Sequence, residues 1–319
     1  EAPDLMDYLD PIPEIYKNHN FKDQIRAQWV RVELDVNWKF FCDNFNESYH
    51  TRFVHPQVPS VIDQDHFTSR YEMFPKGHAR IIQMGRPSLR DKVNEDEDHP
   101  FKMILESWGV DVNQYPDYET LSEKGWTDLK KAKRKLYKEK GYHHYEHLSD
   151  EELTESPFQF VFPNIAMGVQ ADGCILLNWF PHPTDPEKCF FDLWDMGYPI
   201  GGSAKGIGKT GRENDQAFTS TSAGIGKKDE ANDQEFLSRT KVNPVKLQEV
   251  ELDFRDYDDG KGVEDLWDHV VYQDWQLTDG LRRGVRSKGY QEPYLSAQET
   301  RVRYFHETLH DYLNGKEYK

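Results

Sequence analysis

Hydrophobic and polar residues alternate along several short stretches of this chain, as is typical of strands that bury one face. These stretches span residues 27–36, 66–74, 78–84, 158–170, 174–181 and 188–195. The sequence ADG at 171–173 is well suited to a hairpin turn between two of them. Because short turns join neighbouring strands that run in opposite directions, the pattern predicts an antiparallel sheet.

Apolar residues at three- and four-residue spacing predict helices elsewhere, over residues 37–50, 118–140, 263–285 and 297–314. The first of these helices is expected to bury an aromatic face made of Trp38, Phe41, Cys42, Phe45 and Tyr49. The second is rich in charge and is expected to lie on the surface. Strands that come mostly before the long final helices predict an α+β fold, with the sheet wrapped on long helices.

The other flank of the first predicted helix carries Asp43, Glu47 and His50 at positions i, i+4 and i+7. The surrounding segment is so aromatic that we expect it to be at least partly enclosed. His55 follows five residues after His50, and the proline after it disfavours helical backbone. The helix should therefore end just before His55, which allows the second imidazole to turn back toward the first.

Asp274 falls in the middle of the apolar face predicted for the helix over 263–285. That face consists of Val263, Leu266, Trp267, Val270, Val271, Leu277, Leu281 and Val285. A carboxylate that faces the core without a countercharge is strongly destabilising, so Asp274 should meet a cation. Two imidazoles and one carboxylate with open coordination positions form the facial triad typical of non-haem Fe(II) sites that activate dioxygen.

With these residues in place, the chain resembles the catalytic domain of the Rieske non-haem iron oxygenases, the α subunits of aromatic ring-hydroxylating systems. The resemblance rests on NWKFFCDNFNESYHTRFVHP at 37–56 and FVFPNIAMGVQADGCILLNWFP at 160–181. It also rests on VVYQDWQLTDGLRRGVRSKGY and LSAQETRVRYFHETL near the C-terminus. It covers the chain from about residue 30 onward, with interruptions, and implies a helix-grip fold that holds the iron between helix and sheet.

The resemblance also implies roles for individual residues. His50, His55 and Asp274 correspond to the ligands of a mononuclear Fe(II). Glu47 corresponds to the acidic residue that bridges electron transfer from a neighbouring subunit's iron–sulfur cluster, where many members of the family have aspartate. Asn44 is a candidate for a contact behind the ligands, and an exposed amide is an equally good interpretation of it.

The activity implied by the resemblance is that of an oxidoreductase of aromatic compound catabolism, which uses Fe(II) and dioxygen to hydroxylate an aromatic or similar apolar substrate. The implied partners are a reductase or ferredoxin as electron donor and further copies of the chain in a homotrimer or other ring oligomer. Two alternatives stay open. One is a Rieske monooxygenase or demethylase that acts on O- or N-methyl groups, and the other is a non-enzymatic helix-grip domain that binds hydrophobic ligands.

The cysteines depart from the family pattern. A Rieske cluster requires two cysteines and two histidines in paired motifs, and the three cysteines Cys42, Cys174 and Cys189 have no such spacing. Residues 1–36 look like the family's connection between its two domains. We therefore expect the cluster on a missing N-terminal Rieske domain or on a separate chain, with residues 37–319 as the catalytic iron domain.

Three further segments contain motif-like sequences. Residues 200–243 are rich in glycine and polar residues, which predicts a flexible insertion or lid, and its GIGKT lacks the first phosphate-loop glycine because Ser203 stands there. HETLH at 306–310 fits a zinc-protease pattern but lacks a third ligand, so its histidines are expected at the surface. HHYEH at 143–147 is interpreted as a solvated helix face or loop.

Composition adds limits on partners and location. The chain has 319 residues and a net charge of −17, which argues against nucleic acid and anionic membranes as partners. No apolar run approaches the roughly 20 residues that span a bilayer. Three cysteines without evident pairing favour a reducing compartment and hence the cytoplasm.

Overall fold

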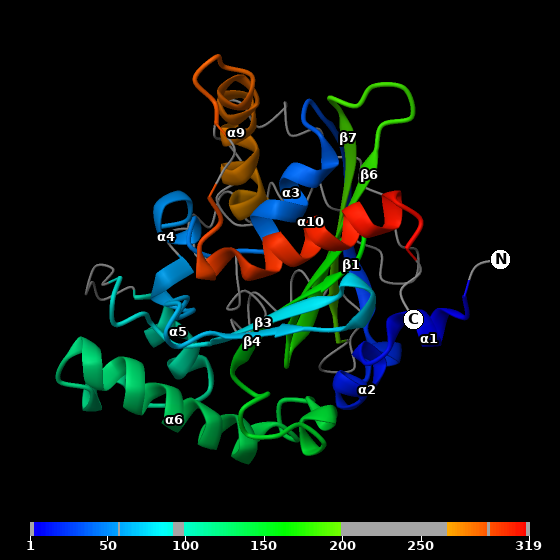
Figure 1. Cartoon of the computed structure of the whole chain (residues 1–319). Helices are drawn as coiled ribbons and strands as arrows, with labels where there is room; N and C mark the ends of the chain where they lie inside the picture. Colours follow the sequence, from blue (N-terminus) through cyan, green and yellow to red (C-terminus); the bar gives the residue numbers. More distant parts are fainter. Residues whose placement is uncertain (1–2, 57, 92–98, 199–266, 292–293, 317–319) are drawn as a thin grey trace.

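Seven antiparallel strands form the sheet at the centre of the molecule, in the order β1-β7-β6-β5-β4-β3-β2 (Figure 1). The computed structural model describes residues 3–56, 58–91, 99–198, 267–291 and 294–316. The strands are β1 Ile25–Leu34, β2 Arg70–Met73, β3 Ala79–Met84, β4 Glu155–Val161, β5 Ile165–Gln170, β6 Gly173–Pro181 and β7 Cys189–Gly197. The predicted antiparallel sheet and α+β class are thus confirmed.

One strand prediction is wrong. The stretch 158–170 forms two strands, β4 and β5, because a turn at Phe162–Asn164 interrupts it. Pro163 has no N–H to give to a strand ladder, and Asn164 instead exchanges hydrogen bonds with the backbone of Trp179 at 2.7 and 3.1 Å. The hairpin turn predicted at 171–173 is confirmed, since only Ala171 and Asp172 separate β5 from β6.

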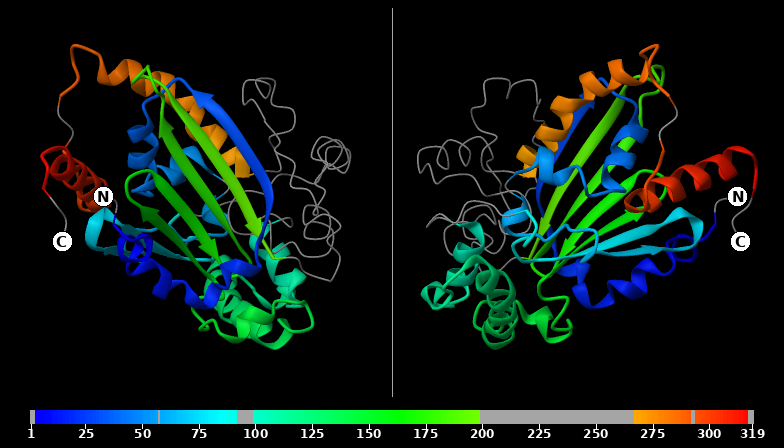
Figure 2. Two further views of the ribbon diagram at one scale, coloured as in Figure 1. Left: turned by 90° about the vertical axis from the view of Figure 1, so that its right-hand side faces the viewer. Right: turned by 60° about the vertical axis from the view of Figure 1, so that its left-hand side comes forward.

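The helices of the described residues are α1 Leu5–Leu9, α2 Ile12–Ile15, α3 Trp38–Phe45, α4 Thr51–Val54, α5 Pro100–Ser107, α6 Tyr118–Leu136, α9 Trp267–Val285 and α10 Thr300–Leu313. Helices α3, α9 and α10 lie on one side of the sheet, and α1 and α2 lie on the other (Figure 2). On that other side Ile12 and Tyr16 pack against Val161, Val169 and Cys174. Both faces of the sheet are therefore covered over part of their area.

The face toward α3 and α10 holds a group of rings that we call the aromatic cluster, made of Phe41, Phe160, Trp179, Phe191 and Phe305. All five side chains are at most 1% exposed. Phe41 of α3 stacks on Trp179 of β6 with centroids 6.0 Å apart and an interplanar angle of 3°. These contacts fix α3 on the sheet, which places the start of the histidine-bearing segment.

Two surface predictions need correction. Helix α6 is charged on its outer side, yet its inner side is buried, and Leu121 and Leu129 belong to a second hydrophobic cluster. In the HHYEH run, His144 is only 8% exposed, and its Nε2 lies 2.7 Å from the carbonyl oxygen of Ala171. An imidazole that is tied to a carbonyl inside the fold is part of the packing, so the solvated interpretation of that residue is wrong.

Residues 200–243 lie outside the described residues, as does the start of the helix predicted from residue 263. No helix among the described residues combines the length and the apolar character that crossing a membrane requires.

Candidate metal centre

Helix α3 ends at Phe45, so the single helix predicted over 37–50 is wrong in its second half. The buried side chain of Asn46 competes for the last turn, because its Nδ2 donates to the carbonyl of Cys42 at 2.8 Å. The backbone N–H of Asn46 donates to the same carbonyl at 3.1 Å. The chain then turns, and α4 begins at Thr51 with His50 at its N-cap.

Because the helix ends early, Asp43, Glu47 and His50 do not lie on one flank of a single helix as predicted. Asp43 stays on α3 and faces His306 of α10, with 2.7 Å between Oδ1 and Nε2. Glu47 and His50 lie in the turn and contact each other. The expectation of an enclosed aromatic segment is wrong for Tyr49 and Phe53, which are 42% and 78% exposed.

His55 lies where the sequence predicts. Helix α4 ends at Val54, and His55 follows as its C-cap with φ −120° and ψ 71°, outside the helical region. Its side chain is 2% exposed. The bend returns its imidazole to His50, and the two ring centroids are 5.3 Å apart.

Asp274 lies on the buried side of α9 and is 2% exposed, as the sequence predicts. The rest of the predicted apolar face is partly wrong, since Leu277, Leu281 and Val285 are 42–50% exposed. Thr278, one turn after Asp274, is buried in their place. The C-terminal part of α9 stands away from the other helices, so only the first part of this helix contributes to the site (Figure 1).

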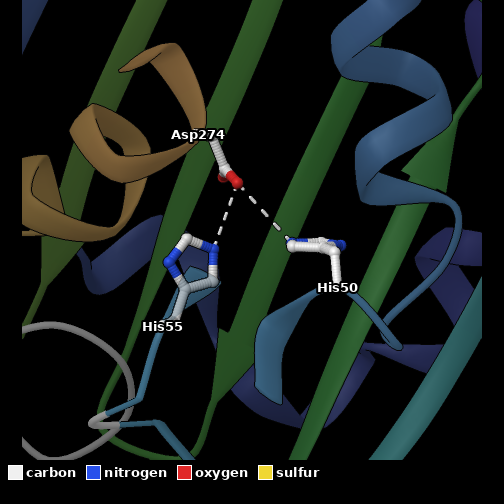
Figure 3. Close-up of side chains that lie close together, drawn as sticks. All are labelled: His50, His55 and Asp274. Carbon is white, nitrogen blue, oxygen red and sulfur yellow. Dashed lines mark ion pairs between the residues drawn. The ribbon is translucent and has the colours of Figure 1, made fainter. Parts of the chain in front are cut away.

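Three side chains, two from the ends of α4 and one from α9, meet at one point, as Figure 3 shows. Asp274 Oδ1 lies 3.2 Å from His55 Nε2 and 3.6 Å from His50 Nε2. Two donor atoms that each lie about 2.1 Å from one ion are at most about 4.2 Å apart, so both distances suit a shared ion. Within the described residues these are the only three side chains of suitable type that converge in this way.

The outer nitrogens of both imidazoles are held by oxygen atoms. His55 Nδ1 lies 2.8 Å from Gln273 Oε1, and His50 Nδ1 contacts Glu47 Oε1. Since these oxygens accept hydrogen bonds, each Nδ1 carries the proton and each Nε2 has its lone pair on the side of Asp274, where His50 Nε2 also lies 3.4 Å from Asn44 Nδ2. His55 Nε2 is buried and makes no hydrogen bond to any described residue. This donor set fits a divalent metal ion.

Asn44 and Glu47 surround the three side chains. Asn44 Nδ2 donates to Asp274 Oδ1 at 3.1 Å, so Asn44 is not the exposed amide of the alternative interpretation. The Glu47 side chain is 8% exposed. Burial lowers the pKa of His50, but the hydrogen bond and charge of Glu47, together with the charge of Asp274, raise it above the ordinary value overall.

The three side chains line a cavity of about 60 Å³ between the helices and the sheet. Its remaining wall is mostly apolar and includes Phe45, Val58, Ile62, Ile81, Phe158, Ile175 and Val270. A volume of about 10–15 Å³ on this measure holds one water molecule, so there is room for several groups of that size. A metal centre here would face an apolar chamber.

The other sequence candidates for metal binding do not converge. His306 and His310 of the HETLH motif are exposed, as predicted, and His306 pairs with Asp43. The three cysteines are buried thiols that form no disulfide with one another. Gln64 and Gln83 also line the cavity, although no motif in the sequence indicated a role for them. Only the alternation in 78–84 placed Gln83 on a face with Ile81, which is a weak signal for a pocket residue.

Comparison with known families gives one match. The family described as "Ring hydroxylating alpha subunit (catalytic domain)" matches residues 21–199 and 243–315 of this chain. The match therefore extends over most of the chain and includes all three converging side chains. No curated protein matches the chain.

Solved structures with low sequence identity are similar over almost the whole chain. A quaternary ammonium Rieske monooxygenase, CntA, has 13% identity and a TM-score of 0.49, with 98% of this chain and 56% of that chain covered. Naphthalene 1,2-dioxygenase from Rhodococcus sp. has 16% identity and a TM-score of 0.40, with 97% and 61% covered. Dicamba monooxygenase has 11% identity and a TM-score of 0.37, with 99% and 64% covered. The chain thus spans somewhat more than half the length of these proteins.

Proposed function

From the premise that this chain belongs to the family of ring-hydroxylating α subunits, whose catalytic domain it matches, we propose that it is the oxygenating part of a Rieske-type oxygenase. Catalytic domains of this family bind a mononuclear Fe(II). The proposed reaction is hydroxylation of an aromatic or similar apolar small molecule with dioxygen. The observation that carries the proposal is the buried convergence of two imidazoles and one carboxylate on an apolar cavity.

His50, His55 and Asp274 are the proposed ligands of the iron. Their donor atoms face one point, and the cavity that they line leaves space beside that point for other groups. Bound Fe(II) supplies the redox chemistry that dioxygen requires. The chain itself fixes the ligands: Gln273 orients His55, Glu47 orients His50, and Asn44 holds Asp274. The apolar wall excludes bulk water and binds the hydrocarbon part of the substrate.

Glu47 is the proposed bridge for the incoming electron. Its carboxylate contacts the outer nitrogen of His50, so it is one hydrogen bond away from a proposed iron ligand. The electron would come from a Rieske cluster in an adjacent subunit of a homotrimer or other ring oligomer, which a reductase or ferredoxin reduces. The cysteine spacing supports a cluster held outside these residues. The three buried thiols form no disulfide with one another, which favours a reducing compartment, and we include the cytoplasm in the proposal.

Metal analysis tests the proposed site. The chain is purified without oxygen, supplied with Fe(II), freed of excess metal and assayed for bound iron. We expect about one iron per chain, and Asp274→Ala should retain less than about a tenth of it, because the loss of one of three ligands opens the site. Its circular dichroism spectrum should remain that of the wild type. Full iron occupancy in Asp274→Ala contradicts the assignment.

Asp43→Asn is the matched control for this experiment. Asp43 is a carboxylate on α3, outside the proposed ligand set, and it is 39% exposed and pairs with His306. Iron binding should be unchanged in this variant. Product analysis with a complete electron-transfer chain then separates ring dihydroxylation from single hydroxylation and from removal of O- or N-methyl groups.

A further inference from the structure

We infer that Gln64 and Gln83 form the polar end of the substrate pocket and select one class of substrate. That class is a small, mostly apolar molecule with one uncharged group that both donates and accepts a hydrogen bond, such as a carboxamide. The inference rests on the proposed function, since it concerns the same cavity, and it adds the chemistry of the substrate.

The two glutamines differ from the rest of the cavity wall. Gln83 lies on β3 two residues after Ile81, so both side chains point to the same side of the sheet, and both line the cavity. Gln83 is only 1% exposed. Gln64 comes from the loop after Val58–Ser60 and lines the same cavity as the proposed iron ligands. An apolar side chain at position 83 would suit the aliphatic surroundings, so the amide needs another explanation.

The two amides satisfy each other only in part. Gln64 Nε2 donates to Gln83 Oε1 at 3.4 Å. Gln64 Oε1 and Gln83 Nε2 are buried, and neither has a hydrogen-bond partner in the described part of the chain. If both amides were turned over, the bond would run the other way and would again leave one N–H donor and one oxygen acceptor unused. The pair therefore offers one donor and one acceptor in either orientation.

The backbone holds this pair together. The N–H of Asp63 donates to the carbonyl of Met84 at 2.8 Å, and the two residues form an isolated antiparallel bridge. Asp63 and Met84 are the chain neighbours of Gln64 and Gln83, so the bridge keeps the two amides adjacent. Asp63 is itself buried and accepts from Arg86 at 3.3 Å. The donor and the acceptor are thus positioned before any ligand arrives, which favours binding of a matching group.

The charges around the cavity favour an uncharged ligand. Among its described lining residues there is no lysine or arginine to neutralise an anion. The acidic lining residues are Glu47 and Asp274, and a bound ferrous ion would offset both. A buried amide that lacks a partner is disfavoured, and a ligand group with the complementary donor and acceptor removes that penalty in both glutamines.

Four phenyl compounds of nearly equal size test the inference. Benzamide donates and accepts, acetophenone only accepts, benzoate is an anion, and benzamidine is a cation. Binding to the 319-residue chain is measured by calorimetry, both without metal and with Fe(II) under exclusion of oxygen. We expect benzamide to bind at least about 10-fold more tightly than each of the other three, because only benzamide satisfies both amides without a charge.

Substitutions assign the preference to the two glutamines. Gln83→Met and Gln64→Met should each reduce the advantage of benzamide over acetophenone to less than about threefold, because the complementary amide is gone. Gln83→Glu should shift the preference to benzamidine. This variant tests the same position through tighter binding of a ligand, whereas the Met variants test it through a weaker preference. Gln170→Met is the matched control, since Gln170 is buried on β5, donates to Ser156 Oγ at 3.0 Å and does not line this cavity. It should keep the preference.

The outcomes separate this inference from the proposed function. Equal binding of benzamide and acetophenone, a preference that survives the substitutions at both glutamines, or no binding of any of the four compounds overturns the inference. If the chain binds iron but shows no preference, only the inference fails. If it binds no iron but keeps a preference that depends on Gln64 and Gln83, only the proposed iron function fails.

Discussion

The aromatic cluster and the cavity lie on the same face of one sheet, and they differ in what fills the space above the strands. In the cluster, Phe41 of α3 stacks on Trp179 and Phe191 with centroids 6.0 and 6.3 Å apart, and all three rings are at most 1% exposed. In the cavity, the strands meet α4 and α9 through Ile81, Ile175 and other side chains that leave about 60 Å³ open. One region is solid, and the other is hollow and carries ionisable groups.

Strand register accounts for much of this difference. Ile81, Phe158, Gly168 and Ile175 are partners across β3, β4, β5 and β6, and β5 contributes no side chain to this row. A Cβ at Gly168 would lie 3.1 Å from Ile175 and 3.3 Å from Phe158, so these two side chains lean over the glycine and form part of the cavity wall. Alternation along the strands is thus enough to create the buried face that the aromatic cluster and the cavity share. The size of each side chain decides whether that face is filled.

The largest effect is expected in the aromatic cluster. Phe41→Ala should lower the free energy of unfolding by about 3–5 kcal/mol, because it leaves a void between buried rings. Phe53→Ala is the control on the same segment, and it should change the free energy by less than about 0.5 kcal/mol since Phe53 is 78% exposed. Urea denaturation measures both. The iron content of the folded protein should be unchanged. A Phe41 variant that keeps full stability but binds no iron would show that Phe41 serves the metal centre and not the stability of the fold.

Glu47→Gln should act on the reaction and leave the fold unchanged. In the complete enzyme with its cluster and electron donor, we expect full iron content but turnover about 100-fold slower, because the group that contacts His50 loses its charge. Glu299→Gln, at a half-buried carboxylate that accepts a hydrogen bond from Tyr49, serves as control and should keep normal turnover. Unchanged turnover in Glu47→Gln counts against the bridge.

Asn44→Ala should likewise affect the metal centre and not the fold, with a smaller effect than Glu47→Gln. Loss of the 3.1 Å hydrogen bond to Asp274 should weaken Fe(II) binding about 10-fold, because the carboxylate is no longer held toward the imidazoles. Competition with a chelator measures the affinity. Asn113→Ala, at an exposed turn, is expected to bind iron like the wild type. An Asn44 variant with unaltered affinity shows that the hydrogen bond does not position Asp274.

The smallest effect is expected where α3 and α10 meet at the surface. The hydrogen bond that His306 donates to the Asp43 carboxylate, together with the charge of Asp43, raises the pKa of His306 above its ordinary 6.5, against the opposing effects of partial burial and of Lys39. The resulting stabilisation is fully present below pH 6.5 and is lost as the pH rises through the raised pKa. It should amount to at most about 0.5 kcal/mol, since solvent screens the pair.

Unfolding of the wild type and of His306→Gln at about pH 5.5 and about pH 9 measures this contribution. The stability difference between the two proteins should be larger at the lower pH. Asp43→Asn should remove the same pH dependence, and neither substitution should change iron binding. A stability difference between wild type and His306→Gln that grows as the pH rises would contradict a raised pKa of His306 in the folded protein.

Much of the fold and the positions of the key side chains were predictable from local patterns. Alternation located the strands apart from the break at Pro163, and the proline after His55 correctly predicted the end of the preceding helix. The core position of Asp274 followed from helical spacing. The segments at 37–56, at 160–181 and near the C-terminus indicated the same family that the match over 21–199 and 243–315 identifies.

Other features depended on contacts that no local pattern contains. The side chain of Asn46 ends α3 early, and this turns Glu47 toward His50 and leaves Asp43 to meet His306. Leu277 and Leu281 of α9 repeat at helical spacing, yet they are 42% and 43% exposed, because this helix buries the side that carries Asp274 and Thr278.

Hydrophobic periodicity and proline act over a few residues, so the sequence alone shows which segments prefer strand or helix and which ionisable groups are buried. Only the tertiary structure decided that Asp274 meets imidazoles 219 and 224 residues earlier in the chain, and that Gln64 and Gln83 share one cavity. Strand register and helix packing bring such distant side chains together, and both depend on contacts throughout the molecule.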